Sequence, residues 1–264
     1  MKAISWSIIL ATLGLATVQA ADAPPQGPMY VVAYVDVLAT AAPQATLLLE
    51  QYRNASRREP GARGIDLYKQ KGRANGFALT EVWQDNAAYE MHRKAAAAAQ
   101  LGGAMKLLQL GPWDVRVHTP YAGDSSALAS ASANASTSAN ASASANASAN
   151  ASVNASARAN ARANANANAI TLLVHVDVPP PFLADCEKVL SAYIESSRKD
   201  AGLLHFAAFR ALPPRINHFT VMETWEDAAA LDAHQRAAHT RTYRADLAPM
   251  LGALYDERAY QKIN

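Results

Sequence analysis

Hydrophobic and polar positions divide the chain into two patterned blocks, 29–120 and 170–264, and each block predicts the same six elements. Apolar runs rich in Val, Ile, Tyr and Phe predict strands, and apolar positions three and four residues apart predict helices. The first block has these patterns at 29–37, 43–57, 65–70, 77–83, from 85 onward and at 113–118. The second has them at 170–178, 182–199, 203–211, 219–225, from 227 onward and at 254–261. The order βαββαβ predicts an α+β fold of ferredoxin-like connectivity in each block.

Local signals mark where the helices begin and end. Asp85 and Asp227 stand where the second helix of each block should start. A short carboxylate at that position accepts hydrogen bonds from the free N–H groups of the first turn. Gly61 and Gly202 follow the first helix of each block and predict its end.

The two blocks match each other residue by residue, which indicates an internal duplication. Residues 34–37 match 175–178, and 56–61 match 197–202, both at an offset of 141. After a one-residue slip the offset becomes 142, and further residues of the first block recur: Asn75, Phe77, Glu81, Trp83, Asp85, Ala87, Ala88 and His92. Their counterparts are Asn217, Phe219, Glu223, Trp225, Asp227, Ala229, Ala230 and His234.

Each copy predicts an antiparallel sheet with helices on one face and the other face bare. A bare apolar sheet face has to pack against another surface, and the second copy is the obvious partner. We therefore expect an intramolecular dimeric α+β barrel, with two ferredoxin-like domains packed sheet to sheet, helices outside and cavities between sheet and helices. Further association of the fused chain through its sheet edges stays open.

The first twenty residues have the pattern of a secretory signal peptide. Lys2 precedes an apolar run at 4–17, and small residues at Val18 and Ala20 suit cleavage after Ala20. The run is short for a membrane span. We expect a periplasmic or secreted protein that is free of the membrane after cleavage, with an uncleaved N-terminal anchor as the alternative.

Residues 121–169 predict a low-complexity linker between the copies. From Ala127 to Ala169 nearly every second residue is alanine, and mostly serine and asparagine lie between. Alternation normally indicates a strand, but such small and polar side chains bury too little surface to offset the entropy of ordering. We expect this segment to be disordered.

Composition and charge exclude several classes of protein. Of 264 residues, 24 are Lys or Arg and 22 are Asp or Glu, so the net charge is +2, and half the residues are apolar. This balance argues against a nucleic-acid partner and against a wholly disordered chain. The single cysteine, Cys186, allows no internal disulfide and no cysteine metal cluster. It aligns with Ala45 and is expected to be a small packing residue.

A short motif, Glu-x-Trp-x8-His, recurs where the third strand of each copy leads into the second helix. It consists of Glu81, Trp83 and His92 in the first copy and of Glu223, Trp225 and His234 in the second. Together with the element order, this motif resembles the antibiotic biosynthesis monooxygenase (ABM) domain of the dimeric α+β barrel superfamily. The resemblance covers both copies.

The resemblance implies a cofactor-independent monooxygenase that oxidises a quinol-like or polyketide-like aromatic with dioxygen. Such a site needs an apolar pocket, a base and an anchor for the phenolate oxygen. His92 and His234 would accept the proton, since histidine titrates near neutral pH. Trp83 and Trp225 would form an aromatic wall, and Glu81 and Glu223 would orient the histidines. The alternatives that stay open are core packing for the tryptophans, packing or helix capping for the histidines, and an exposed cross-strand contact for the glutamates.

The two copies depart from the family pattern and from each other. Tyr89 has the spacing of a tyrosine in polyketide-oxidising relatives, but Leu231 replaces it in the second copy. Those relatives have an asparagine four residues before the tryptophan, where this chain has Leu79 and Val221. His239 is a candidate substrate contact that has Ala97 as its counterpart, which hints that the second copy retains more of a site.

Two other functions stay open beside the monooxygenase. A haem-binding or haem-degrading enzyme of the same superfamily would use His234 or His239 as the axial ligand, with Asp177 near the place of a supporting asparagine. A non-catalytic periplasmic protein that binds a small ligand would need only the apolar cavity. No metal ligands are predicted, because the seven histidines are scattered and no metal-binding pair recurs in both copies.

Overall fold

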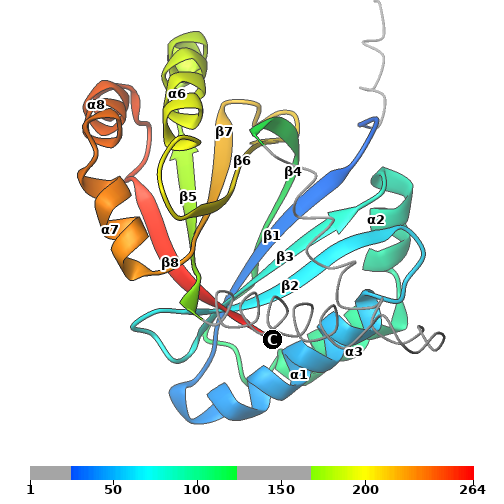
Figure 1. Cartoon of the computed structure of the whole chain (residues 1–264). Coiled ribbons are helices and arrows are strands. Elements are labelled where there is room, and N and C mark those ends of the chain that lie inside the picture. Colours follow the sequence, from blue (N-terminus) through cyan, green and yellow to red (C-terminus); the bar gives the residue numbers. More distant parts are fainter. Residues whose placement is uncertain (1–24, 124–167) are drawn as a thin grey trace, which may run out of the picture.

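The computed structural model describes residues 25–123, the N-terminal repeat, and 168–264, the C-terminal repeat (Figure 1). The predicted signal peptide and most of the predicted linker lie outside these residues. The N-terminal repeat contains β1 (Met29–Asp36), α1 (Ala42–Ser56), β2 (Ala62–Gln70), β3 (Gly76–Trp83), α2 (Asn86–Arg93), α3 (Ala96–Met105) and β4 (Asp114–Gly123). The C-terminal repeat contains β5 (Ile170–Asp177), α6 (Leu183–Ser197), β6 (Leu203–Ala211), β7 (His218–Trp225), α7 (Ala228–Arg236), α8 (Ala238–Leu247) and β8 (Asp256–Ile263). Within these ranges, no helix is both long and apolar enough to cross a bilayer.

The elements follow the predicted order, with two differences. Each predicted second helix is two helices, because Ala95 and Ala237 adopt extended backbone conformations, with ψ of 153° and 149°. The strand predicted to end at 118 continues to Gly123, beyond the predicted domain boundary. It is longer because its end pairs with β6 of the other repeat, where Gly123 lies opposite Ala207.

Caps and glycines place α2 and α7 against the preceding helices. Asp85 and Asp227 cap them as predicted, and each carboxylate accepts a hydrogen bond of 2.8 Å from the backbone N–H three residues later. Gly61 has a φ of +83°, and a Cβ atom there would lie 2.4 Å from the Cβ of Ala88. Only glycine allows both this backbone conformation and this close approach. The end of α1 and the start of α2 are thereby held together.

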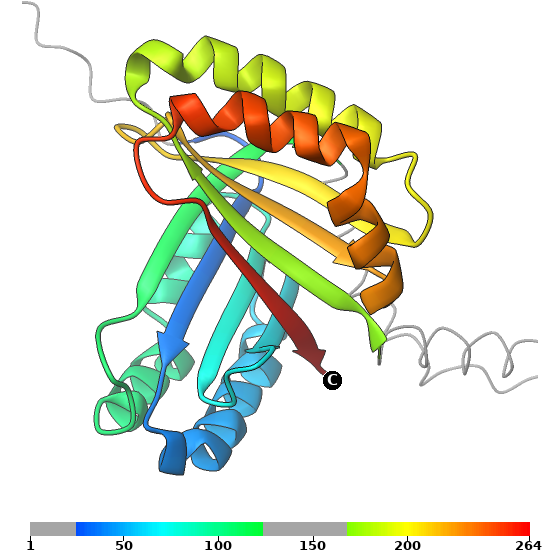
Figure 2. The same cartoon turned by 90° about the vertical axis from the view of Figure 1, so that its left-hand side faces the viewer.

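Eight strands of the described residues close into one antiparallel barrel in the order β1-β3-β2-β8-β5-β7-β6-β4. The two repeats meet at two seams, β2 with β8 and β4 with β6. Helices α1 to α3 cover the outside of one half, and α6 to α8 cover the other (Figure 2). The predicted sheet-to-sheet arrangement of the two copies is confirmed.

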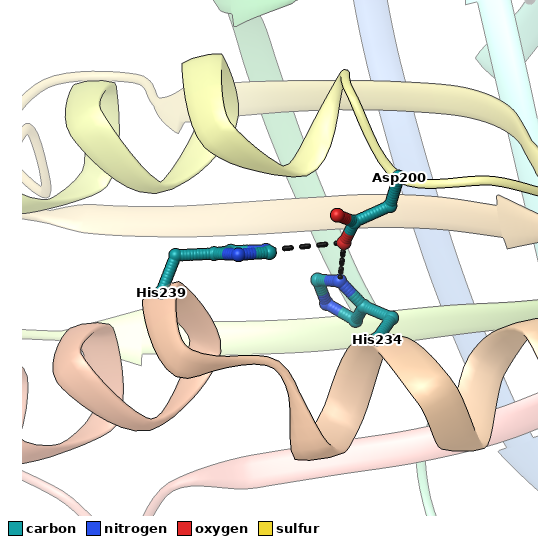
Figure 3. Close-up of side chains that lie close together, drawn as sticks. All are labelled: Asp200, His234 and His239. Atoms are coloured by element: carbon teal, nitrogen blue, oxygen red, sulfur yellow. Dashed lines mark hydrogen bonds and ion pairs between the residues drawn. The ribbon is translucent and has the colours of Figure 1, made fainter.

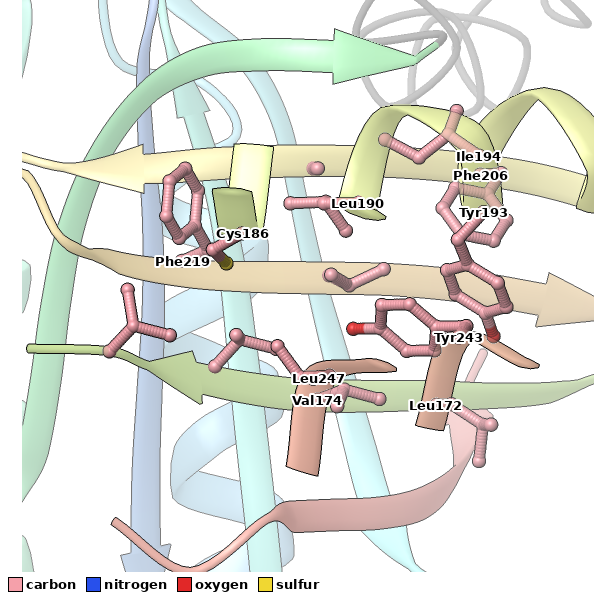
Figure 4. Close-up of a cluster of buried hydrophobic side chains, with 14 of the residues drawn as sticks. Leu172, Val174, Cys186, Leu190, Tyr193, Ile194, Phe206, Phe219, Tyr243 and Leu247 are labelled. Carbon is pink, nitrogen blue, oxygen red and sulfur yellow. The ribbon is translucent and has the colours of Figure 1, made fainter. Parts of the chain in front are cut away.

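Alternation along each strand gives the sheet two different buried faces. On the helix-facing side of the C-terminal repeat, Cys186, Leu190, Phe219 and Leu247 pack between the helices and the sheet (Figure 4). Cys186 is fully buried there, as expected for a packing residue. The opposite face lines the barrel and combines apolar with polar side chains.

A chain of polar side chains crosses the barrel interior and joins the repeats. Tyr34 Oη lies 2.8 Å from His175 Nε2, and His175 Nδ1 lies 3.0 Å from Thr220 Oγ1. Thr220 Oγ1 lies 2.8 Å from His118 Nε2. Burial lowers the pKa of His118 to about 4 and that of His175 to about 2, so both rings are neutral near pH 7. This chain fixes the register of one half against the other.

Candidate functional site

The predicted motif forms one contact cluster on the helix-facing side of β3. Glu81 and Trp83 are two residues apart and therefore point to the same face. Trp83 Nε1 donates a 2.9 Å hydrogen bond to Glu81 Oε2. The indole ring stacks on His92 of α2, with ring centroids 4.3 Å apart. The structure thus brings together the three residues that the sequence singled out.

Tyr52 and Glu59 complete this cluster. Tyr52 Oη donates to Glu81 Oε1 at 2.7 Å and lies 2.7 Å from His92 Nε2. Glu59 Oε2 lies 2.9 Å from His92 Nδ1. Both ring nitrogens of His92 are therefore engaged. We call Tyr52, Glu59, Glu81, Trp83 and His92 the Tyr52 network.

The C-terminal repeat contains an equivalent set, which we call the Tyr193 network: Tyr193, Asp200, Glu223, Trp225 and His234. Tyr193 Oη lies 2.7 Å from Glu223 Oε1 and 2.8 Å from His234 Nε2. His234 Nδ1 lies 2.7 Å from Asp200 Oδ2, and Trp225 Nε1 donates to Glu223 at 3.1 Å. These distances differ from those of the Tyr52 network by no more than 0.2 Å.

Carboxylates set the charge of the Tyr52 network. Burial lowers the pKa of His92, but the nearby Glu81 and Glu59 carboxylates outweigh it, so the net shift is upward. Burial raises the pKa of Glu81, but contacts with His92, Trp83 and Tyr52 bring it below its usual value. Both shifts favour the charged forms, an anionic Glu81 and a cationic His92, relative to the isolated side chains. Burial and Glu81 raise the pKa of Tyr52, which keeps its proton.

In the Tyr193 network, the pKa values of the glutamate and the histidine shift in the opposite directions. Burial raises the pKa of Glu223 to about 7. Burial also lowers the pKa of His234, aided by the neighbouring His239, and the Asp200 carboxylate does not fully offset this. The equivalent contacts therefore favour the neutral forms of Glu223 and His234 more than those of Glu81 and His92.

A pocket of about 210 Å³ opens onto the Tyr52 network between the sheet and helices α2 and α3. Its lining includes Tyr52, Glu81, Tyr89, His92, Arg93 and Trp113. Tyr89, predicted to contact substrate, reaches this pocket, and burial raises the pKa of its hydroxyl to about 12. Trp83 is fully buried and stacks against His92 rather than lining the pocket. The aromatic walls are therefore Tyr89 and Trp113, and Trp83 supports His92.

Larger side chains fill the corresponding region of the C-terminal repeat. At the offsets of 141 and 142, Val174 replaces Ala33, Thr240 replaces Ala98 and Glu257 replaces Val115. Glu257 accepts hydrogen bonds from Gln235 at 3.0 Å and from Arg244 at 2.9 Å. The side chains of Glu223 and His234 are only 1% exposed. Glu223 and His234 are thus more enclosed than Glu81 and His92, whose side chains are 5% and 3% exposed.

His239 occupies a different place from the other predicted residues. It lies at a groove of about 420 Å³ between α6 and α8, with Tyr193 and Tyr243, whose rings stack at 3.8 Å. Its Nε2 lies 3.1 Å from Asp200 Oδ2 (Figure 3). His239 therefore approaches the Tyr193 network from the side opposite the sheet.

Sequence reasoning missed Tyr52 and Glu59 and their counterparts Tyr193 and Asp200 as site residues. In the sequence both tyrosines lie within the predicted first helices, 43–57 and 182–199, where they fit the apolar face. A signal was present, because a tyrosine is kept at the offset of 141 and an acidic residue is kept at 59 and 200.

The side chains that were expected to hold a haem group are not arranged to bind one. Asp177 lies on the barrel-facing side of β5, with an oxygen 2.8 Å from His218, whereas His234 and His239 lie on the helix-facing side. The proposed axial and supporting residues are thus separated by the sheet.

Two βαββαβ repeats that close one barrel, each with a Tyr, Glu, Trp and His cluster between sheet and helices, define a dimeric α+β barrel contained in a single chain. The model of the family described as antibiotic biosynthesis monooxygenase matches residues 28–101 and 169–246. The chain therefore belongs to that family, with two tandem domains.

Solved structures share this fold at low sequence identity. A protein of Fusobacterium nucleatum described as a candidate monooxygenase is 14% identical, with a TM-score of 0.66 over 90% of this chain and 93% of that chain. A protein of Lactobacillus acidophilus with the same description is 12% identical, with a TM-score of 0.58 over 90% and 94%. An anthrone oxidase-like protein is 8% identical, with a TM-score of 0.62 over 90% and 92%. No curated protein matches the chain.

Proposed function

We propose that the pocket of the N-terminal repeat oxidises a small electron-rich phenol, of quinol or polyketide type, with dioxygen and without a bound cofactor. The observation that carries this proposal is the opening of the Tyr52 network into a pocket of about 210 Å³. Proton-transfer groups there face aromatic walls of the kind that hold a planar ring. Membership of the family supports an oxidation by dioxygen.

The reaction balances without another reductant. The phenol loses its hydroxyl proton, and the resulting anion donates an electron to dioxygen. Recombination of the two radicals at an activated ring carbon forms a peroxide. Loss of water from it leaves a quinone. One oxygen atom forms the new carbonyl group, the other leaves as water with two substrate hydrogens, and the substrate supplies all four electrons.

His92 accepts the substrate proton, and Glu81 supports it by raising the pKa of His92. A histidine whose pKa is raised is a stronger base when neutral, and as a cation it stabilises a phenolate. Glu81 and Glu59 provide this shift, and Tyr52 connects His92 to Glu81 at 2.7 Å on each side. Tyr89 keeps its proton and can donate a hydrogen bond to the substrate oxygen.

Oxygen uptake tests this proposal. The chelator-treated protein is assayed with a panel of quinols and phenols, corrected for autoxidation, beside His92→Gln and the matched variant His234→Gln. We expect uptake that His92→Gln abolishes and His234→Gln retains, because the side chains of Glu223 and His234 are only 1% exposed. Uptake that survives His92→Gln would contradict the proposal. Phenol binding without any uptake would instead support a ligand-binding protein.

We also propose that the chain acts outside the cytoplasm after cleavage behind Ala20. The apolar run at 4–17 and the small residues before the expected cleavage point support this. Mass measurement of the mature protein from the periplasmic or secreted fraction tests it. A protein that keeps residues 1–20 and stays with the membrane would show an uncleaved anchor instead.

A further inference from the structure

Three potential metal ligands converge in the C-terminal repeat. Asp200 follows α6, His234 lies on α7 and His239 lies on α8, and their side chains point toward one another (Figure 3). Asp200 Oδ2 lies 2.7 Å from His234 Nδ1 and 3.1 Å from His239 Nε2. One donor atom from each residue lies within 4.8 Å of the others.

The donor set suits a divalent transition metal. Two imidazole nitrogens and one carboxylate oxygen are ligands that zinc, manganese, iron and cobalt accept in proteins. Atoms bound to one ion are typically about 3 Å apart, since metal–ligand bonds are about 2 Å long. Small side-chain movements would bring all three atoms to such positions.

His239 Nε2 has an unmet bonding capacity. It is buried from solvent and makes no hydrogen bond, although Asp200 Oδ2 lies nearby, because the contact is outside hydrogen-bonding geometry. Asp200 Oδ2 is an ion-pair neighbour of this nitrogen and not its hydrogen-bond acceptor, so a bound cation would satisfy the nitrogen without displacing a hydrogen bond.

His234 is already oriented as a ligand. Its Nε2 lies 2.8 Å from the Tyr193 hydroxyl, leaving Nδ1 to face Asp200. Histidines that bind metals usually have such an outer hydrogen bond, which fixes the ring.

The N-terminal repeat lacks the third ligand. Glu59 and His92 correspond to Asp200 and His234, but Ala97 stands in place of His239. Among residues 25–123 and 168–264, no other group of three potential ligands is found. The site is therefore specific to one repeat, and the other repeat shows that the fold accepts alanine at this position.

Solvent can reach the cluster. The side chains of His239 and Asp200 are 24% and 22% exposed. The groove of about 420 Å³ between α6 and α8 ends at His239. An ion held by three protein ligands would keep an open position for water on this side.

We infer that Asp200, His234 and His239 bind one divalent transition-metal ion, with zinc as the reference ion. The site is separate from the proposed oxidation pocket, which lies in the other repeat.

Metal binding to the untagged, chelator-stripped full chain tests this inference. Equilibrium dialysis with zinc, followed by elemental analysis, should give one equivalent per chain. His239→Ala should lose that equivalent, whereas His218→Ala, at the mouth of the barrel, should keep it. Zinc should raise the melting temperature of the unmodified protein and of His218→Ala but not of His239→Ala.

Two results would overturn the inference: no zinc bound by the unmodified protein, or a full equivalent retained by His239→Ala. The circular dichroism spectrum of His239→Ala, compared with that of the unmodified protein, distinguishes loss of a ligand from loss of the fold. If His239→Ala fails to fold, Asp200→Asn provides the same comparison, since an amide is a much weaker metal ligand than a carboxylate.

Discussion

Tyr52 Oη lies 2.7 Å from His92 Nε2, although the two residues are 40 positions apart. The contact connects α1 to α2 across the end of the sheet. It gives the buried histidine a partner on the side opposite Glu59. Because Tyr193 and His234 repeat the contact at 2.8 Å, it belongs to the architecture of both repeats.

Replacing the tyrosines separates stability from catalysis. Tyr52→Phe leaves Glu81 Oε1 and His92 Nε2 without their shared partner, which should lower the free energy of unfolding by about 1–3 kcal/mol. It should also slow oxidation by about a hundredfold, the scale of a lost proton-transfer group. Urea unfolding and oxygen uptake measure the two effects. Tyr193→Phe should show a similar loss of stability with oxidation intact. An equal loss of oxidation in both variants would be evidence against the proposal that only the N-terminal pocket is active.

His92 should make the stability of the protein depend on pH. Its pKa is above the usual 6.5 in the folded state, so the folded protein binds more protons than the unfolded chain in that range. The stabilising contribution is complete below pH 6.5 and is lost as pH rises through the folded-state pKa. Urea midpoints measured in chelator should therefore fall across this window. His92→Gln should remove that part of the decline, and an unchanged profile would show that His92 is not responsible.

Tyr89 should affect substrate binding more than the chemical step. Tyr89→Phe keeps the aromatic wall and removes only the hydroxyl, so KM should rise by about threefold to tenfold, equivalent to one hydrogen bond. The value of kcat should change little. Steady-state oxygen uptake measures both constants. A large fall in kcat with KM unchanged would place the hydroxyl in the chemistry instead.

Thr220 should be important for holding the two halves of the barrel together. Thr220→Val removes the hydroxyl between His175 and His118 and leaves two buried ring nitrogens without that partner. We expect a loss of about 1–3 kcal/mol in the free energy of unfolding. Thr119→Val, beside His118 on a partly exposed strand position, should change it by less than about 0.5 kcal/mol. Equal effects from the two variants would contradict a special role for the interior chain.

The element order was predictable because periodicity and duplication reinforced each other. The strand of residues 170–178 and the cap at Asp85 follow from local pattern alone, and the structure has both almost as predicted. The break at Ala95 was not predictable, since a run of alanines favours an uninterrupted helix. The break recurs at Ala237, where the sequence has no alanine run, so it belongs to the architecture of the repeat.

The site was predictable only where its residues are close in sequence. Glu81 and Trp83 share a strand face, and His92 lies on α2, the helix that directly follows this strand. Tyr52 and Glu59 come from another element, and an amphipathic helix gives a buried tyrosine the same pattern whether or not it carries chemistry. The pairing of β2 with β8 forms when the barrel closes, and no local sequence pattern predicts a pairing between strands so far apart in the chain.

Covalent fusion frees the two halves of the barrel from symmetry. In a homodimer of identical chains, every substitution appears in both halves, so neither site can change alone. Here Leu231 occupies the position equivalent to Tyr89, and His239 the position equivalent to Ala97, within one barrel. A single gene can thus retain an open pocket in one half while the other half, still needed to close the sheet, acquires a different set of side chains.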